Sequence, residues 1–374
     1  MANEERRGDE QPSFETLFGR PAFLTASAPG RVNLIGEHTD YNGGFVLPTV
    51  IPQRTVVELS PRADRLVRVW SASVPEPRLV TYELGTEARR GGWSDYVQGI
   101  TWVLGAAGHA LCGLDARITS GVPLGSGLSS SAALEISLMR ALRAAFDLAL
   151  DDVPLALLAR RAENEFVGAP VGIMDQMACS LAGERDALFL DTRTLTYELV
   201  LLPPGVELIV INSGVAHNHA KGDYRTRRRE CEEASRLLGV PQLRDLGQAD
   251  LARVMALPDP LGRRARHVVT EDDRVLAATR AMRANDAAAL GRLFFESHDS
   301  MRDDYEVSVP EVDVLVEEAR LQPDVFGARL TGGGFGGAVV VLVRAGSARQ
   351  VAERVAARYA QRCSRRATVL VPQT

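Results

Sequence analysis

The sequence predicts an α+β protein of two domains, and three observations support this prediction. The chain has 374 residues, which is more than one hydrophobic core usually organises, since cores stop growing near roughly 250 to 300 residues. Apolar residues make up 45% and charged residues 24% of the chain, an ordinary composition for a folded globular protein. Strand-like and helix-like segments occur in both halves of the chain, as in α+β folds.

The first half begins with strands and continues with helices. The polar residues 1–13 lack periodicity, and we expect a flexible N-terminal arm there. β-Forming residues separated by turn residues predict strands at 45–51, 55–59 and 65–70. A helix over 94–111 and a short strand over 116–120 follow. Apolar residues then recur at helical spacing over 134–146 and 155–166.

The second half is a mixture of strands and helices. Apolar strand-like runs over 187–190 and 206–211 flank Pro203 and Pro204, which we take as the domain boundary. Helical patterns follow at 223–238, 273–300, 310–321 and from 347 onward. Two further strands are predicted at 326–330 and 338–343. We therefore expect an arm over 1–13, an N-terminal domain over 14–203 and a C-terminal domain over 204–374.

Charge and cysteine content exclude several classes of function. The chain has 43 basic and 48 acidic residues, a net charge of -5, whereas nucleic-acid binding proteins present a basic surface. Lys221 is the one lysine, so the Walker A pattern G-x-x-x-x-G-K is absent. The four cysteines lack the C-x-x-C spacing of a zinc site. With no signal peptide and no apolar run of about 20 residues, we expect a cytoplasmic protein with no nucleic-acid or membrane partner.

A glycine- and serine-rich loop precedes the predicted helix over 134–146. Residues 123–135 read PLGSGLSSSAALE. A helix N-terminus has unpaired N–H groups and a partial positive charge, and it therefore attracts phosphate. Gly125 and Gly127 allow the backbone to approach phosphates closely, while Ser129, Ser130 and Ser131 offer hydroxyl groups to phosphate or Mg²⁺. The alternative interpretation is an ordinary tight turn with a serine N-cap.

A second cluster is dense in polar residues. Residues 28–44 read APGRVNLIGEHTDYNGG and contain Arg31, Glu37, His38 and Asp40. Carboxylates and an imidazole can donate to and accept from several hydroxyl groups in fixed directions, so the cluster suits a neutral polyhydroxylated ligand. Taken one at a time, the same residues have plainer interpretations as surface charges and a structural histidine.

A third cluster lies between the predicted strands at 326–330 and 338–343. Residues 330–338 read LTGGGFGGA and can turn tightly against another backbone or a ligand. They match G-x-G-x-x-G formally, but the helix and acidic residue of a dinucleotide fold do not follow, and we reject that interpretation. Two acidic residues remain open: Asp175 is either a general base or a structural acid, and Glu163 either a magnesium ligand or a structural acid.

Together the three clusters resemble the galactokinases of the GHMP small-molecule kinase superfamily. Residues 30–44 resemble the galactokinase signature, residues 123–135 the superfamily ATP-binding motif, and residues 331–337 its third motif, in the same order and at similar separation. The resemblance covers the chain from Phe14 onward. It implies the two-domain GHMP kinase fold, with an N-terminal mixed sheet with helices, a C-terminal ferredoxin-like α+β domain, and an active site in the cleft between them.

The resemblance also implies an activity and a set of site residues. The γ-phosphoryl group of ATP would pass to the C1 hydroxyl of α-D-galactose, giving galactose 1-phosphate and ADP. Asp175 would take the proton from this hydroxyl, and Arg31 would stabilise the transition state. Sugar-binding residues would be Glu37, His38, Thr39, Asp40, Gly172 and Tyr224. ATP would be held by Gly125, Ser126, Gly127, Leu128, Ser129, Ser130 and Ser131. Mg²⁺ would be held by Ser131 and Glu163.

Two departures and two alternatives accompany this interpretation. Ala338 stands where the family often has cysteine, and Ser126 lies at a variable position; neither affects the expected reaction. One alternative is a kinase for a related sugar, such as N-acetylgalactosamine or arabinose. The other is a galactose sensor without catalysis, although such a sensor would have no need of a base or a metal ligand. We expect a monomer, with a dimer as the alternative.

Overall fold

The computed structural model describes residues 11–74, 78–215 and 220–371, and the chain divides into two compact units. Unit 1 consists of Met1–Ala28, Arg54–Gly121 and Ala133–Ala169, and unit 2 of Pro29–Gln53, Val122–Ala132 and Pro170–Thr374. Most of the arm expected over 1–13 lies outside the described residues. The expected boundary at 203–204 stays a prediction, since it concerns two consecutive domains whereas these units are made of several segments each.

Unit 1 contains a mixed sheet. Its strands are the second half of β3 (Pro48–Pro61), β4 (Leu66–Ser71), β5 (Leu79–Glu83) and β6 (Leu114–Ser120). β3 pairs antiparallel with β6, and β4 pairs antiparallel with β5 but parallel with β6. The sheet is therefore mixed, as predicted. β1 (Leu24–Asn33) pairs with β3, and both strands continue from one unit into the other.

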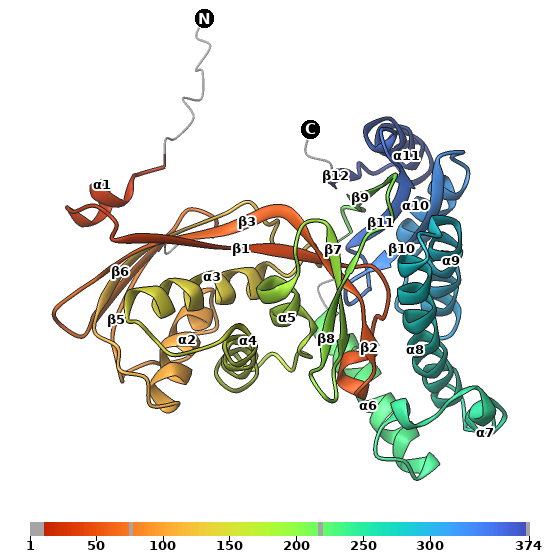
Figure 1. Ribbon diagram of the computed structural model, residues 1–374, viewed down its shortest axis with the longest axis horizontal. Helices are drawn as coiled ribbons and strands as arrows, with labels where there is room; N and C mark the ends of the chain where they lie inside the picture. Colours follow the sequence, from red (N-terminus) through yellow and green to blue (C-terminus); the bar gives the residue numbers. More distant parts are fainter. Residues whose placement is uncertain (1–10, 75–77, 216–219, 372–374) are drawn as a thin grey trace, which may run out of the picture. The chain divides into compact units, whose positions relative to one another are not determined.

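Helices lie against the sheet of unit 1. A short helix α1 (Phe14–Phe18) precedes the sheet, and α2 (Ser94–Ala106), α4 (Asp152–Arg161) and most of α3 (Ser130–Ala145) lie on one side of it (Figure 1). α2 ends before the predicted residue 111, because Gly108 takes a left-handed φ of 85° and the His109 N–H bonds back to the Leu104 carbonyl. The helix predicted to end at 166 is α4 followed by η2 (Ala162–Val167), a π-helical turn that Gly168 ends.

Unit 2 contains a four-stranded antiparallel sheet. Its strands are β9 (Val206–Asn212), β10 (Val325–Thr331), β11 (Ala338–Arg344) and β12 (Thr368–Val371). They lie in the order β10-β11-β9-β12, and every neighbouring pair is antiparallel. With helices after β9 and after β11, this is the predicted ferredoxin-like arrangement. Ala338 to Val343 of β11 are fully buried, as expected for a strand in the middle of a core.

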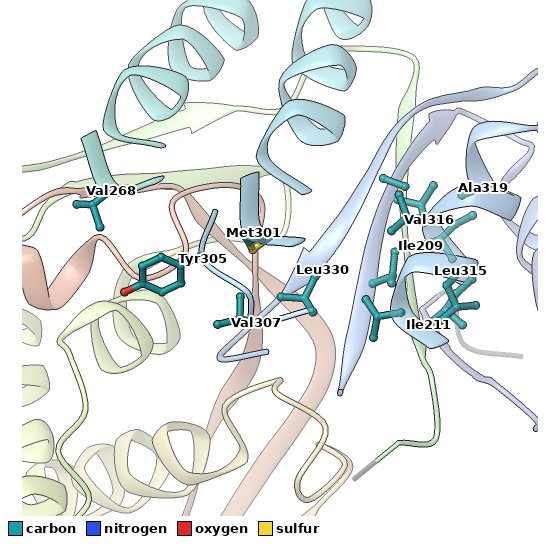
Figure 2. Packing of buried hydrophobic residues seen from close by; sticks show 14 of the residues in the cluster. Ile209, Ile211, Val268, Met301, Tyr305, Val307, Leu315, Val316, Ala319 and Leu330 are labelled. Carbon is teal, nitrogen blue, oxygen red and sulfur yellow. The ribbon is translucent and has the colours of Figure 1, made fainter. Parts of the chain in front are cut away.

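The core of unit 2 lies between this sheet and its helices. The long helices are α6 (Ala220–Leu238), α8 (Leu261–Arg283), α9 (Ala287–Asp303), α10 (Pro310–Arg320) and α11 (Ala348–Cys363). α9 and α10 pack against β10, and α11 packs against β9 and β12. Figure 2 shows Ile209 and Ile211 of β9 close to Leu315 and Val316 of α10.

The predicted single helix over 273–300 is wrong: α8 and α9 are separate. Asn285 has a left-handed φ of 57°, which ends α8, and the Asp286 side chain accepts a 2.8 Å hydrogen bond from the Ala289 N–H to begin α9. The apolar periodicity continues through this break, so the sequence pattern did not indicate the N-cap at Asp286.

The short elements of unit 2 are η1 (Asp40–Asn42), β2 (Phe45–Val46), α5 (Met174–Leu181), β7 (Asp186–Asp191), β8 (Tyr197–Leu201), η3 (Leu243–Asp245), η4 (Gln248–Asp250) and α7 (Leu251–Met255).

The strands predicted at 45–51 and 55–59 are also divided differently. β2 is limited to Phe45–Val46, and the apolar residues on both sides of 52–54 belong to the one long strand β3. Across the described residues, no helix has the length and apolar character needed to cross a membrane.

Candidate active site

An ion pair between Arg31 and Asp175 forms the centre of the site. Arg31 lies near the end of β1 and Asp175 in the first turn of α5. The Arg31 Nε and Nη2 atoms donate to Asp175 Oδ1 at 2.9 and 2.6 Å. Burial alone would lower the pKa of Arg31. The adjacent Asp175 carboxylate has the larger net effect, and it raises the pKa of Arg31 above its ordinary value. The guanidinium therefore remains a fixed positive charge beside the carboxylate.

The glycine- and serine-rich loop contacts this ion pair directly. Arg31 Nη1 donates to the Gly127 carbonyl at 2.6 Å, and the Ser129 hydroxyl donates to Asp175 Oδ2 at 2.6 Å. Gly125, Gly127 and Ser129 all have left-handed φ angles, which is uncommon for serine. The loop is thus held in a specific conformation at the entry to α3, and within it the buried Ser126 hydroxyl donates to the Pro123 carbonyl.

The third glycine cluster packs against the same loop. A Cβ atom at Gly332 would lie 3.1 Å from the Gly127 carbonyl oxygen and 3.4 Å from its Cα. Two backbone segments therefore approach each other where both residues are glycine. This contact brings the end of β10 beside the entry to α3.

Glu37 is a buried carboxylate with several internal donors. The Gly332 N–H donates to Oε1 at 2.7 Å, and the side chains of Arg329 and Asn33 donate to Oε2 at 2.7 and 2.6 Å. Burial raises the pKa of Glu37, and Arg329 opposes this rise. Arg329 is itself fully buried and lies 3.6 Å from Glu271. No sequence pattern indicated Arg329 or Asn33 as a partner of Glu37.

His38 is buried in an unusual backbone conformation. Its φ of 64° is left-handed, and its Nδ1 lies 2.8 Å from the Tyr41 hydroxyl. Burial, followed by the nearby His267 and Arg227, lowers the pKa of His38 to about 3. The imidazole is therefore neutral at any pH near 7 and can present one donor and one acceptor nitrogen.

Asp40 and Gly172 fit each other closely. A Cβ atom at Gly172 would lie only 1.5 Å from Asp40 Oδ2. No other residue type fits at position 172 while Asp40 keeps its place. The predicted pair of sugar-binding residues is thereby linked sterically.

One cavity of about 120 Å³ collects most of these side chains. All of its lining residues belong to unit 2, although they come from four distant parts of the sequence. They are Arg31, Glu37, His38, Asp40, Val171, Gly172, Met174, Asp175, Tyr224, Gly332 and Gly333. A small polar cavity with a carboxylate–guanidinium pair at its wall suits a hydroxylated ligand.

Thr39, Glu163 and the predicted ATP loop from Gly125 to Ser131 lie outside this lining. Thr39 is buried, and its hydroxyl donates to the Gly36 and Phe45 carbonyls, which supports the loop from within. Ser131 belongs to unit 2, and Glu163, a buried residue of η2, belongs to unit 1. Within the described ranges, no group of three or more His, Cys, Asp or Glu side chains forms a ready metal site. The magnesium prediction for Ser131 and Glu163 therefore stays a prediction.

Three family models match the chain, in the order expected from its motifs. Residues 12–61 match the galactokinase galactose-binding signature, residues 95–183 the GHMP kinase N-terminal domain, and residues 278–361 the GHMP kinase C-terminal domain. The chain is also 43% identical over 370 residues to a galactokinase of Roseiflexus sp. (strain RS-1), covering 97% of this chain and 94% of the relative. This chain belongs to the galactokinase family.

Further relatives agree with this assignment to the galactokinase family. A galactokinase of Streptomyces coelicolor is 44% identical over 352 residues, 91% of this chain and 90% of that protein. The crystal structure of Lactococcus lactis galactokinase complexed with galactose superposes with a TM-score of 0.91 at 32% identity, covering 95% of both chains. The mevalonate kinase of Methanococcus jannaschii, with a TM-score of 0.68 at 17% identity and coverage of 94% of this chain and 98% of that one, shares the fold. As a galactokinase of the GHMP kinases, the protein is an ATP-dependent sugar kinase.

Proposed function

We propose that this galactokinase-family enzyme transfers the γ-phosphoryl group of ATP to the C1 hydroxyl of α-D-galactose. The products are galactose 1-phosphate and ADP. The observation that carries the proposal is the small cavity in which the Arg31–Asp175 pair shares the wall with Glu37, His38 and Asp40. Such a cavity combines groups that bind a sugar with a carboxylate suited to its reacting hydroxyl.

Asp175 is the group that receives the proton of the attacking hydroxyl. Arg31 and Ser129 together fix both of its oxygens, and about a quarter of its side chain remains exposed, so a ligand can reach it. Phosphoryl transfer usually has a loose transition state, and catalysis then depends mainly on positioning and on stabilising charge. A carboxylate held by three hydrogen bonds is well positioned for this task. Arg31 supplies the adjacent positive charge.

The other cavity residues orient the sugar. The Asp40 carboxylate accepts hydrogen bonds from sugar hydroxyls, and Glu37 adds a second carboxylate at the cavity wall. The neutral His38 ring contributes one further donor or acceptor. The Tyr224 hydroxyl keeps its proton, because burial, followed by the nearby Asp40 and Asp175, raises its pKa well above the ordinary value. Tyr224 can therefore both donate and accept.

We assign ATP to the loop that enters α3, and Mg²⁺ to Ser131 of this loop together with Glu163 of η2. The loop from Gly125 to Ser131 leads into the N-terminus of α3, where backbone N–H groups attract phosphate. Ser131 and Glu163 are hard oxygen donors, which suits Mg²⁺, an ion commonly bound by one or two protein oxygens together with substrate phosphates. These residues would hold the ion, which, when bound, neutralises charge on the phosphates.

The proposal is tested by the identity of the phosphorylated product. ADP release is measured with Mg-ATP and, in turn, galactose, glucose, N-acetylgalactosamine, arabinose and mevalonate, and each product is identified by NMR. We expect the fastest release with galactose and the phosphate on C1. Faster turnover of another sugar identifies a kinase for that sugar. Galactose binding by calorimetry without ADP release identifies a sensor and contradicts the proposed reaction.

A further inference from the structure

We propose that Tyr41, Tyr305 and Cys231 hold the His38 imidazole in its Nε2–H tautomer, so that His38 donates a hydrogen bond to the sugar. Tyr41, Tyr305 and Cys231 are not among the residues that line the cavity. They act as positioning residues for sugar recognition. The sugar contact rests on the function proposed above, whereas the tautomer is a property of the free protein.

A continuous chain of hydrogen bonds leads away from His38 Nδ1. Nδ1 lies 2.8 Å from the Tyr41 hydroxyl, which lies 2.7 Å from the Tyr305 hydroxyl, which in turn lies 3.1 Å from Cys231 Sγ. Tyr41 belongs to η1, Cys231 to α6, and Tyr305 follows the end of α9. Segments from three parts of the sequence therefore meet behind one side chain of the cavity.

The chain of hydrogen bonds is uncharged, and its inner members are buried. Tyr305 and Cys231 are buried, and the His38 and Tyr305 rings pack with their centroids 4.7 Å apart. Burial raises the pKa of both tyrosines well above the ordinary value and that of Cys231 to about 11. All the groups are therefore neutral near pH 7, and each hydroxyl has one proton to donate.

Matching the best donors with the best acceptors sets the direction of these hydrogen bonds. An imidazole nitrogen is a good acceptor and a phenol a good donor, whereas a thiol is weak in both roles. Tyr41 therefore donates to His38 Nδ1, Tyr305 donates to Tyr41, and the thiol of Cys231 donates to Tyr305. In the reverse direction, Tyr305 would donate its proton to the sulfur atom, which is a weak acceptor. With Nδ1 accepting, the neutral ring carries its proton on Nε2.

The Nε2 atom is the one left for a ligand. It is buried and has no hydrogen-bond partner among the described residues, and His38 lines the cavity. The Gly333 backbone opposes the lowered pKa of His38 but makes no hydrogen bond of proper geometry with Nε2. A buried donor without a partner is unfavourable. A sugar hydroxyl placed in the cavity would supply the missing acceptor.

The backbone of His38 is fixed by its own contacts. The Asn42 side chain donates to the His38 carbonyl at 2.8 Å, and His267 Nε2 lies 3.2 Å from the Glu37 carbonyl. A left-handed φ such as that of His38 is uncommon for residues other than glycine and persists where surrounding contacts impose it. The ring is thus held both at its backbone and at Nδ1.

The first experiment reads the tautomer in the sugar-free protein. The protein is labelled with ¹⁵N in its six histidines, and the His38 signals are assigned with His38→Gln. We expect a protonated Nε2 and an unprotonated Nδ1 in the wild type, and a mixture of both tautomers in Tyr41→Phe. A protonated Nδ1 in the wild type overturns the proposal.

The second experiment measures sugar recognition with galactose and its monodeoxy analogues. Tyr41→Phe should raise the KM for galactose about tenfold, as expected for the loss of one well-oriented hydrogen bond, with little change in kcat. One deoxy analogue should show the largest rise in KM relative to galactose in the wild type. That rise should be smaller in Tyr41→Phe, because the missing hydroxyl and the substitution remove the same contact. Tyr305→Phe should show the same effect in weaker form.

Tyr359→Phe is the matched control. Tyr359 is also buried in unit 2, and its hydroxyl donates to the Ser213 carbonyl at 2.7 Å, but it does not line the cavity. We expect this variant to keep the wild-type KM pattern. If Tyr41→Phe affects all analogues equally, its role is merely structural and the proposal fails. If the wild type does not bind galactose at all, the proposed function fails, while the ¹⁵N spectrum still decides the tautomer.

Discussion

At the scale of single residues, hydrogen bonds hold the Asp175 carboxylate in one orientation. A general base that acted through its basicity alone would not need to be held in this way. Three hydrogen bonds from Arg31 and Ser129 reach its two oxygens. Each bond restricts where the carboxylate can meet an incoming hydroxyl. The arrangement indicates that position and local charge, rather than basicity, are what the site provides.

Replacing Asp175 or Arg31 should therefore reduce turnover in different ways. Asp175→Asn removes the proton acceptor and should lower kcat for galactose at least about a hundredfold, within the usual range for general acid–base groups. Arg31→Lys keeps the charge but loses the planar set of donors that reaches both Asp175 and the Gly127 carbonyl, and should lower kcat about tenfold or more. Steady-state ADP release with saturating galactose and ATP measures both effects.

A matched control separates chemistry from charge removal in general. Asp259 forms an exposed ion pair with Arg263 at 2.7 Å in the same unit, away from the cavity lining. Asp259→Asn should keep wild-type kcat. Galactose binding by calorimetry should persist in Asp175→Asn, which shows that the fold is intact. Wild-type turnover in both Asp175→Asn and Arg31→Lys would refute the mechanism.

At the scale of secondary-structure elements, the junction between α8 and α9 depends on one side chain. Asp286 is exposed and accepts the Ala289 N–H at 2.8 Å. Asp286→Ala should lower the free energy of unfolding by about 1 kcal/mol, the usual value of an N-cap. Asp286→Asn keeps an acceptor oxygen and should lose much less. Urea denaturation of the three proteins tests this difference, and equal losses in both variants would show that the cap does not stabilise α9.

Local sequence patterns predicted most elements but not those that depend on a single backbone angle. The apolar pattern found α2, α6 and α10, because one face of each helix is buried. It missed the break between α8 and α9 at Asn285, which has a left-handed φ. The apolar pattern continues from one helix to the next without a gap. The same limit applies to the loop at Ser129, whose left-handed φ accompanies a hydrogen bond to the distant Asp175.

The candidate site shows a similar division. Glu37, His38 and Asp40 lie close together in the sequence, so their motif was visible without a structure. Arg329 lies 292 positions from Glu37 and in a predicted strand, where an arginine usually faces solvent. Only the fold of unit 2 brings it, fully buried, onto the Glu37 carboxylate. Nothing short of the tertiary structure would identify such a partner.

At the scale of the whole molecule, acid acts on the stability of unit 2 through a buried histidine. Unit 2 contains His267, which is buried and lies 2.9 Å from the Ser300 hydroxyl through Nδ1. Burial, together with Arg274, lowers the pKa of His267 to about 4 against the opposing effect of Glu271. Between pH 4 and about 6.5 the unfolded chain therefore binds a proton that the folded chain does not. Acid in this range favours unfolding.

The size of this effect follows from the difference in pKa. A shift from 6.5 to about 4 corresponds to about 3 kcal/mol, which is lost as the pH falls through this window. His38 acts in the same direction, whereas Asp272, whose pKa burial raises to about 7, and Glu37 act in the opposite direction. Because these contributions overlap, the comparison that isolates His267 is between the wild type and His267→Gln.

We expect the stability advantage of the wild type over His267→Gln to shrink by about 3 kcal/mol between pH 7 and pH 4. Tryptophan fluorescence is the wrong probe, because Trp70, Trp93 and Trp102 all belong to unit 1. Hydrogen exchange of the β11 amides, corrected for the intrinsic rate at each pH, reports on unit 2 instead. An advantage that stays constant with pH would mean that His267 takes up its proton as readily in the folded protein as in the unfolded chain.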